Sequence, residues 1–246
     1  MRIVMIGSGY VGLVSGACFA DFGHQVTCVD KDESKIARLN AGQIPIYEPG
    51  LDDLVARNAA ASRLAFTTEL AGAVEQADVV FIAVGTPSRR GDGHADLSYV
   101  YAAAAEMAPC LKGFTVVVTK STVPVGTGDE VERIIGETNP EAQFAVASNP
   151  EFLREGAAIE DFKRPDRIVI GIEDERARPV MEEVYRPLYL NQAPILFTGR
   201  RTSELIKYAA NAFLAVKITF INEIADLCEA VGADVQQVAR GIGLDN

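Results

Sequence analysis

The sequence predicts an α/β fold in which a doubly wound, mostly parallel sheet is followed by one long helix that begins a second, helical domain. Three observations support this prediction. Short β-branched segments alternate with helical segments over residues 1–200, which is typical of a parallel sheet covered on both faces. A glycine-rich turn joins the first strand to the first helix. Residues 202–231 contain neither glycine nor proline, as expected of a long helix.

The first thirty residues are the unit on which the fold prediction mainly rests. Residues 2–6 are an apolar, β-branched run, residues 7–12 read GSGYVG, and a helix is expected from 13 to 22. A second strand, residues 25–29, ends on Asp30. A strand, a GxGxxG turn, a helix, a strand and an acid in this order indicate a Rossmann-like dinucleotide-binding unit.

The glycine turn predicts where a dinucleotide binds. Gly7 permits the tight turn out of the strand, Gly9 lets the backbone approach a pyrophosphate, and Gly12 lets the helix lie close to the sheet. The N-terminus of the following helix offers unpaired N–H groups and a partial positive charge to the phosphates. A glycine-rich turn of some other α/β protein is the alternative reading of GxGxxG alone.

Asp30 predicts which dinucleotide binds. Its position at the end of the second strand suits a carboxylate that accepts hydrogen bonds from the adenosine ribose hydroxyls. Its negative charge should repel a 2′-phosphate, so the sequence favours NAD over NADP. Lys31 and Lys35 lie close by in the sequence and weaken that preference a little.

The rest of the chain continues the alternation of strands and helices. Further helices are expected at residues 31–41, 51–61, 70–76, 97–111, 127–137 and 174–186, and further strands at residues 64–66, 78–84, 114–119, 144–147, 167–171 and 195–197. We therefore expect a dinucleotide-binding domain over residues 1–200 and the start of a helical domain over residues 201–246.

Three strands end in short polar turns. Their sequences are Gly85-Thr86-Pro87, Lys120-Ser121-Thr122 and Asn149-Pro150-Glu151. In an open parallel sheet, ligands bind outside the carboxyl ends of the strands, where the glycine turn also lies. We therefore expect Thr86, Thr122 and Glu151 to converge on the cofactor. Taken singly, each threonine is equally well explained as a helix cap or a turn former.

The long helix, residues 202–231, is apolar around most of its circumference, so we expect it to be buried on several sides. Such a helix usually bridges domains or subunits. Lys207 and Asn211 stand four residues apart and therefore share one face. A lysine on a helix is usually a solvated charge, but this one lies among apolar neighbours.

Composition narrows the classes of function. The formal net charge is −11 with no basic segment, which argues against a nucleic-acid-binding protein. The sequence shows no signal peptide and no run of eighteen apolar residues, so no membrane span is expected. Its four cysteines lack metal-ligand spacing. We therefore expect a cytoplasmic protein with reduced thiols and no metal site.

Seven segments, taken together, carry a family resemblance. They are IGSGYVGL (6–13), YEPGL (47–51), VGTP (84–87), KSTVPVGT (120–127), NPEFLREG (149–156), PDRIVIG (165–171) and KYAANAFLA (207–215). In content and order they resemble the UDP-glucose 6-dehydrogenase family, nucleotide-sugar dehydrogenases that oxidise a sugar C6 alcohol to a carboxylate with two NAD. The resemblance implies NAD as cofactor, UDP-glucose as substrate and a homodimer formed through the helix 202–231.

The resemblance also implies catalytic roles. Glu151 would be the general base or would hold the hydrolytic water, and Thr122 would help to position that water. Lys207 and Asn211 would stabilise the oxyanion and the water at C6. Elementary chemistry supports roles of this type, because two successive oxidations at one carbon require a base and a group that stabilises the alkoxide.

The implied substrate contacts lie mainly in one segment. Phe152 and Leu153 would supply backbone contacts to the sugar nucleotide, and Glu155 would lie near both NAD and the sugar. The catalytic glutamate, lysine and asparagine would touch the substrate as well. The implied NAD site comprises Gly7, Gly9, Tyr10, Val11, Gly12, Asp30, Lys35, Thr86, Thr122 and Glu155.

One feature of the family is not found in residues 1–246. The family's nucleophilic cysteine lies in a GFGGSCF-like motif, and none of Cys18, Cys28, Cys110 and Cys228 has that context. The segment that would carry most uridine contacts is not found either. We therefore expect a truncated or naturally short NAD-binding part that is inactive by itself.

Alternatives to a UDP-glucose dehydrogenase remain. One is a related dehydrogenase acting on GDP-mannose or a UDP-N-acetylhexosamine, or more remotely a β-hydroxyacid dehydrogenase. Another is a non-catalytic module for NAD binding or dimerisation.

Overall fold

The computed structural model describes residues 1–89, 91, 93–191 and 193–244. The chain forms two compact units, Met1–Leu205 and Ile206–Asn246, and the last two residues of the second unit lie outside the described residues. The long helix begins in the first unit and continues into the second.

The elements of the described chain follow the predicted alternation. The strands are β1 (Arg2–Ile6), β2 (Gln25–Val29), β3 (Leu64–Thr67), β4 (Val79–Ile82), β5 (Thr115–Thr119), β6 (Phe144–Ser148), β7 (Ile168–Ile172) and β8 (Ile195–Thr198). The α-helices are α1 (Tyr10–Asp21), α2 (Glu33–Asn40), α3 (Leu51–Ala60), α4 (Leu70–Val74), α5 (Ser98–Met107), α6 (Thr127–Thr138), α7 (Ala158–Lys163), α8 (Ala177–Tyr185), α9 (Arg200–Val231) and α10 (Val235–Ile242), and η1 (Ala108–Cys110) and η2 (Arg186–Asn191) are 3₁₀ helices.

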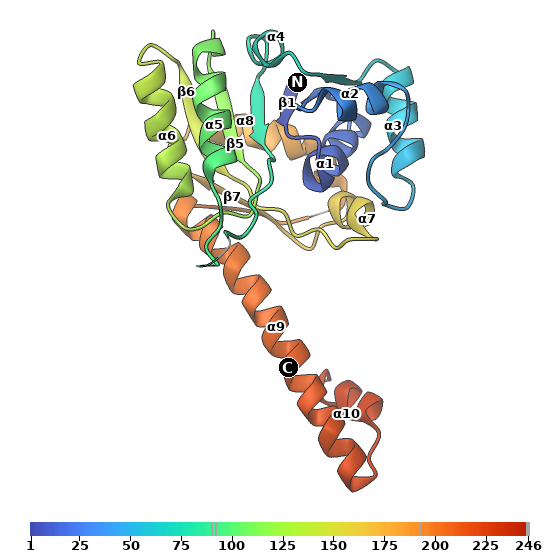
Figure 1. Cartoon of the computed structure of the whole chain (residues 1–246). Helices are drawn as coiled ribbons and strands as arrows, with labels where there is room; N and C mark the ends of the chain where they lie inside the picture. The colour runs from blue at the N-terminus through green and yellow to red at the C-terminus, as the bar shows by residue number, and fades with distance from the viewer. Residues whose placement is uncertain (90, 92, 192, 245–246) are drawn as a thin grey trace. The chain divides into compact units, whose positions relative to one another are not determined.

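The strands described in the first unit form one sheet in the order β3-β2-β1-β4-β5-β6-β7-β8. Every neighbouring pair is parallel except β6 and β7, which are antiparallel. Figure 1 shows this sheet with helices packed around it. The predicted α/β fold with a doubly wound, mostly parallel sheet is thereby confirmed.

The core lies on both faces of the sheet, and β1 contributes to each. Ile3 and Met5 pack in the cluster that includes residues of α1, α3, α7 and α8. Val4 and Ile6 point the other way and pack in the cluster that includes residues of α4, α5 and α6. This alternation is the period-two pattern of a strand, and burial on both faces explains why the strands read as continuous apolar runs.

The structure differs from the expected elements at a few places. Helix α1 begins at Tyr10 rather than at residue 13, because the end of the glycine turn already forms the first helical turn. Helices α7 and α10 were not expected from the sequence. The expected helix 174–186 begins only at Ala177 and continues as the 3₁₀ helix η2.

The end of β1 is the point at which the chain order of the strands reverses, because β2 lies on one side of β1 and β4 on the other. The backbone N–H of Gly7 donates to Val29 O at 2.8 Å, and the N–H of Ala83 donates to Ile6 O at 2.8 Å. These bonds place the glycine turn between the carboxyl ends of β2 and β4, where open α/β sheets bind ligands.

Contact between backbones explains two of the glycines in this turn. Gly7 has φ +102°, and a Cβ added there would lie 2.7 Å from the carbonyl oxygen of Ala83. A Cβ added at Gly12 would lie 1.8 Å from the carbonyl oxygen of Gly7. Both positions therefore exclude a side chain by overlap with main-chain atoms.

The second unit consists of most of α9 followed by α10. Helix α9 ends at Val231 as expected, and the next residue, Gly232, adopts φ +73°. Along α9, large apolar side chains are half or more exposed, among them Phe213, Leu214 and Ile218. Their expected burial is not met within the single chain, so it remains a prediction about an assembly. None of the described helices is long and apolar enough to cross a membrane.

We expect Gly12→Ala to lower the free energy of unfolding by about 3 kcal/mol or more, because the added methyl overlaps a main-chain carbonyl. Gly9→Ala is the matched control, since its Cβ meets no atom within 4 Å and its φ of −76° suits alanine. Urea unfolding followed by circular dichroism measures both variants. Equal stability of the two would contradict this account of the turn.

Candidate functional site

The carboxyl ends of the central strands form one continuous hydrogen-bonded edge. Beyond the bonds at Gly7 and Ala83, the N–H of Lys120 donates to Ile82 O and the N–H of Asn149 donates to Thr119 O, each at 2.9 Å. The turns after β1, β4, β5 and β6 therefore begin side by side. This edge carries the predicted strand-end residues.

The turns after β4 and β5 are joined directly. The Thr86 hydroxyl donates to the backbone carbonyl of Thr122 at 3.0 Å, and the Ser121 hydroxyl donates to Val84 O at 2.7 Å. The structure thus brings together the two threonines that were expected to meet at this edge. Whether they also contact the cofactor stays a prediction.

A buried polar cluster joins the turns after β5 and β6. Lys120 is almost fully buried, and its ammonium group donates to Asn149 Oδ1 at 3.2 Å and to the Tyr185 hydroxyl at 3.4 Å. The Tyr185 hydroxyl in turn donates to Asn149 Oδ1 at 2.5 Å. These contacts fix the starts of the segments that carry Thr122 and Glu151.

At the end of β2, the Asp30 carboxylate binds the glycine turn, residues 7–12. Its Oδ2 accepts the backbone N–H of Ser8 at 2.8 Å and the Lys35 ammonium at 2.8 Å. Burial alone would raise the pKa of the Asp30 carboxyl, but Lys35 and the N–H of Ser8 hold that pKa below its ordinary value. Asp30 is therefore ionised at neutral pH, and Lys35 offsets part of its charge.

The N-terminus of α1 has the features that a pyrophosphate site needs. Its N-cap, Gly9, has no side chain with which to cap the first N–H groups, and the first turn holds no acidic residue. The space around the Gly9 Cβ position is open to 4 Å. The chain therefore fits a dinucleotide phosphate at Gly9, Tyr10 and Val11.

The segment after β6 is held by its own contacts. One carboxylate oxygen of Glu151 accepts the N–H of Leu153 at 2.6 Å. The Arg167 guanidinium lies 4.2 Å from the centre of the Phe152 ring, and Leu153 packs against the core. Glu155 lies close enough to Tyr10 for its charge to contribute to the raised pKa of the tyrosine, which is caused chiefly by burial and by Glu48.

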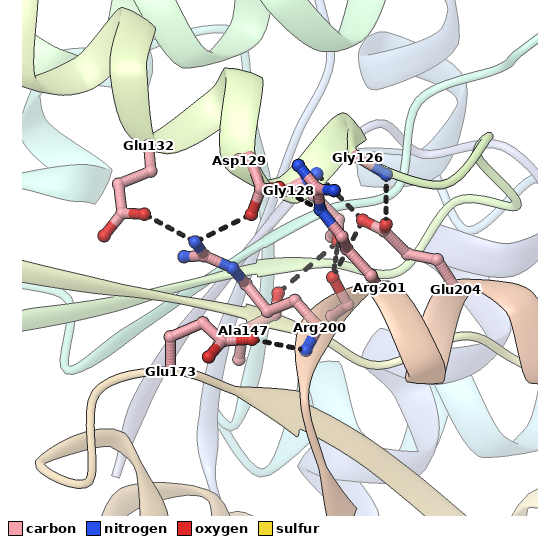
Figure 2. A network of polar contacts seen from close by, with 11 residues as sticks. Gly126, Gly128, Asp129, Glu132, Ala147, Glu173, Arg200, Arg201 and Glu204 are labelled. Carbon is pink, nitrogen blue, oxygen red and sulfur yellow. Dashed lines mark hydrogen bonds and ion pairs between the residues drawn. The ribbon is translucent and has the colours of Figure 1, made fainter.

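A carboxylate from the start of α9 holds the segment that follows β5. Figure 2 shows Glu204 accepting the backbone N–H groups of Gly126 at 2.6 Å and Gly128 at 2.8 Å, at the N-terminus of α6. The Ser148 hydroxyl donates to the same carboxylate at 3.1 Å. Since Thr122 lies four residues before Gly126, Glu204 limits the freedom of the turn that carries it.

Arginine side chains complete this network (Figure 2). The side chain of Arg200 is only 5% exposed, and its guanidinium contacts Asp129 at 2.9 Å and Glu132 at 2.6 Å. Its backbone N–H donates to Glu173 at 3.0 Å, and Arg201 pairs with Asp129 at 2.7 Å. The first turn of α9 is thereby bound to α6 and to the end of β7.

Lys207 and Asn211 lie on the part of α9 that belongs to the second unit. Their spacing of four residues in a continuous helix puts them on one face, as expected. The structure groups the other predicted site residues in the first unit. The approach of Lys207 and Asn211 to Glu151 remains a prediction.

The cysteines in the first unit are unsuited to act as nucleophiles. Burial raises the pKa of Cys18 and of Cys28 to about 12. Cys110 precedes β5, toward the amino ends of the strands and away from the candidate site. No cluster of three or more potential metal ligands occurs among the described residues.

Sequence reasoning missed Glu48, Lys120 and Glu204, three buried charged residues that organise this edge. Glu48 was noticed only within the YEPGL segment and Lys120 only as part of a turn. The signal in the sequence was a charged residue next to apolar or turn residues, which can indicate burial. It does not reveal which distant groups form hydrogen bonds with that residue.

Comparison with known proteins identifies the two parts of the chain. Residues 1–189 match the NAD binding domain of the UDP-glucose/GDP-mannose dehydrogenase family, and residues 201–246 match its central domain. The chain is 79% identical to UDP-glucose 6-dehydrogenase of Rhizobium meliloti (strain 1021) over 247 aligned residues, covering all of this chain and 56% of the relative. It is 51% identical to the Pseudomonas aeruginosa enzyme of that name, covering all of the chain and 55% of the relative.

Solved structures of dehydrogenases named for GDP-mannose and UDP-glucose share the fold of this chain. A GDP-mannose dehydrogenase from Pseudomonas aeruginosa superposes with a TM-score of 0.94 at 39% identity, covering 100% of this chain and 57% of that one. A UDP-glucose dehydrogenase from Pyrobaculum islandicum gives 0.92 at 46% identity, covering 99% of this chain and 56% of that one. The chain thus spans little more than half the length of these relatives.

Asp30→Ala should weaken NAD binding by about 1–3 kcal/mol, the scale of a lost hydrogen bond to a charged group. Calorimetric titration of the chain and the variant with NAD and NADP measures this. Lys35→Met is the control, because it removes the ion pair and leaves the carboxylate, so the preference for NAD should persist. Equal affinity of the unmodified chain for NAD and NADP would refute the role of Asp30.

Glu204→Ala should lower the free energy of unfolding by about 2–4 kcal/mol, because it leaves the buried N–H of Gly128 and the partly buried N–H of Gly126 without an acceptor at the start of α6. Glu137→Gln on the same helix changes an exposed pair with Arg133 outside the first turn, so its effect should stay within about 0.5 kcal/mol. Chemical denaturation compares the two, and a loss no larger than that of the control would contradict the anchoring role.

Proposed function

The chain belongs to the UDP-glucose/GDP-mannose dehydrogenase family, and on this premise we propose that it takes part in the NAD-dependent oxidation of UDP-glucose to UDP-glucuronate. The observation that carries the choice of substrate is the 79% identity to a UDP-glucose 6-dehydrogenase along the whole chain. Residues 1–200 would serve as the NAD-binding domain, and residues 201–246 as the start of the central helical domain.

NAD supplies the hydride acceptor for each of the two oxidation steps. The N-terminus of α1 would bind its pyrophosphate through Gly9, Tyr10 and Val11, and Asp30 would accept hydrogen bonds from its ribose. Thr86 and Thr122, joined by the hydrogen bond between their turns, would line the edge on which the dinucleotide lies. In this proposal, residues of the first unit hold the cofactor.

The chemical roles would belong to residues of the turns after β5 and β6 and of α9. Glu151 would take the proton from the substrate or from the attacking water, and Thr122 would orient that water. Lys207 and Asn211 would stabilise negative charge on the substrate oxygen at C6. Phe152, Leu153 and Glu155 would hold the sugar nucleotide, and the contact of Glu151 with the Leu153 N–H supports a shared orientation of this segment.

A second candidate substrate is supported by one observation. The GDP-mannose dehydrogenase from Pseudomonas aeruginosa matches the fold with a TM-score of 0.94. Titration with UDP-glucose and GDP-mannose distinguishes the two. Two results together would instead support a non-catalytic module: the chain binds NAD but neither sugar nucleotide, and the full-length protein shows no dehydrogenase activity.

We also propose a cytoplasmic location. The four cysteines are free thiols, which agrees with this location.

The 246-residue chain by itself should not turn over UDP-glucose, because none of its cysteines lies in the sequence context of the family's nucleophile. An appreciable steady rate of NADH formation by this chain would show that the chemistry has been misplaced.

Lys207→Ala should reduce kcat of the full-length protein on UDP-glucose by about 10²–10³-fold, because one preorganised donor to an oxyanion is worth about 3–4 kcal/mol. The rate of NADH formation measures this, and Lys217→Ala on the same helix serves as the control that should retain activity. A rate near that of the unmodified protein would make Lys207 an ordinary helix charge.

The chain should form a homodimer through α9, since the exposed apolar side chains of this helix require cover. Light scattering at tens of micromolar should give twice the monomer mass of 26.4 kDa. Phe213→Ser with Ile218→Ser should shift the mass toward the monomer. A monodisperse monomer of the unmodified chain would rule out this interface.

A further inference from the structure

Glu48 is a buried carboxylate with three hydrogen-bond donors. It is 5% exposed, although its neighbour Tyr47 is 86% exposed. Its Oε2 accepts the Tyr10 hydroxyl at 2.5 Å and the backbone N–H of Gly156 at 2.8 Å. Its Oε1 accepts the N–H of Ala158 at 2.8 Å. Such a charge is tolerated inside a protein only when donors surround it, and here they do.

The donors come from two separate parts of the chain. Tyr10 is the first residue of α1 and directly follows Gly9, where the pyrophosphate is expected. Gly156 and Ala158 lie at the end of the segment that begins with Glu151 and includes Glu155. One carboxylate therefore joins the cofactor turn to the segment expected to hold the sugar nucleotide.

The charge states agree with this geometry. Burial would raise the pKa of Glu48, but the Tyr10 hydroxyl and the backbone N–H groups bring it below its ordinary value. Burial and the neighbouring carboxylate raise the pKa of Tyr10. The pair is thus a carboxylate that accepts and a phenol that donates throughout the neutral range.

We propose that Glu48 is a positioning residue that ties the segment 151–158 to Tyr10, so that NAD binding at the glycine turn orders the sugar-nucleotide segment. A pyrophosphate bound at the start of α1 restricts Tyr10, and a fixed hydroxyl holds the Glu48 carboxylate against the N–H groups of Gly156 and Ala158. The inference rests on the proposed function only for the identity of what the segment binds.

A purely structural role is the competing explanation. Glu48 could serve only to cap the short helix α7, whose first residue is Ala158. A cap needs the two backbone contacts but not the Tyr10 hydroxyl. The two explanations therefore differ in what the hydroxyl of Tyr10 does.

Hydrogen exchange of the Gly156 and Ala158 amides, measured with and without saturating NAD, separates the explanations. In the unmodified chain, NAD should slow exchange of both amides by about 5–10-fold, a typical coupling between two sites. Tyr10→Phe keeps both contacts of Glu48 with the backbone, so exchange without NAD should change little, but the additional slowing by NAD should disappear. Tyr47→Phe, at the exposed neighbour, should behave as the unmodified chain.

Glu48→Gln tests the carboxylate itself. An amide offers one acceptor oxygen, so its NH₂ group would face the N–H of either Gly156 or Ala158. Exchange of these amides should be faster even without NAD, whereas Glu160→Gln, an exposed position on α7, should leave it unchanged. If Glu48→Gln does not fold, Tyr10→Phe still decides the matter.

Two outcomes would overturn the inference: NAD-dependent slowing that persists in Tyr10→Phe, or no slowing in the unmodified chain under conditions where calorimetry shows NAD bound. Failure of the proposed function is seen separately, as absence of UDP-glucose oxidation by a full-length protein that binds NAD. In an active full-length protein, Tyr10→Phe should also raise KM for the sugar nucleotide more than it lowers kcat.

Discussion

The close approach of three backbone segments at the end of β1 is the constraint on which this edge of the molecule depends. Gly7 lies against the carbonyl of Ala83, and Gly12 lies against the carbonyl of Gly7. Because neither glycine has a side chain, the start of α1 can pack directly against the junction of β1 and β4. The N–H groups of that helix then face the carboxyl ends of the strands, where the turns with Thr86, Thr122 and Glu151 also begin.

Two buried carboxylates extend this order to loops that lack regular structure. Glu48 accepts the N–H groups of Gly156 and Ala158, and Glu204 accepts those of Gly126 and Gly128. Each therefore fixes the loop that precedes a helix and follows a strand. The same solution occurs twice: a carboxylate from a distant part of the chain accepts backbone N–H groups at the start of a helix.

The sequence alone predicted the elements that local pattern determines, but it did not predict those that depend on contacts between distant parts of the chain. The strand over residues 25–29 was predicted with its observed bounds, since its β-branched run lies between a helix stop and Asp30. Helix α7 was missed because its six residues carry too little periodicity, and its N-terminus depends on Glu48, more than 100 residues earlier. The antiparallel direction of β7 was not foreseen either, because it depends on the path of the chain after β6 rather than on the RIVIG sequence.

The distribution of acids over helix starts explains how a chain of net charge −11 can offer a site to an anionic ligand. Helices α2, α3 and α6 each carry acidic residues in the first turn, which neutralise the positive end of the helix dipole. Helix α1 carries none there, and Asp30, which accepts the N–H of Ser8 in the glycine turn, is paired with Lys35. The positive end of α1 is thus free of acidic side chains in its first turn and remains available to a phosphate, as the open space at Gly9 also allows. Local placement of charge, rather than net charge, therefore decides what this edge of the sheet can bind.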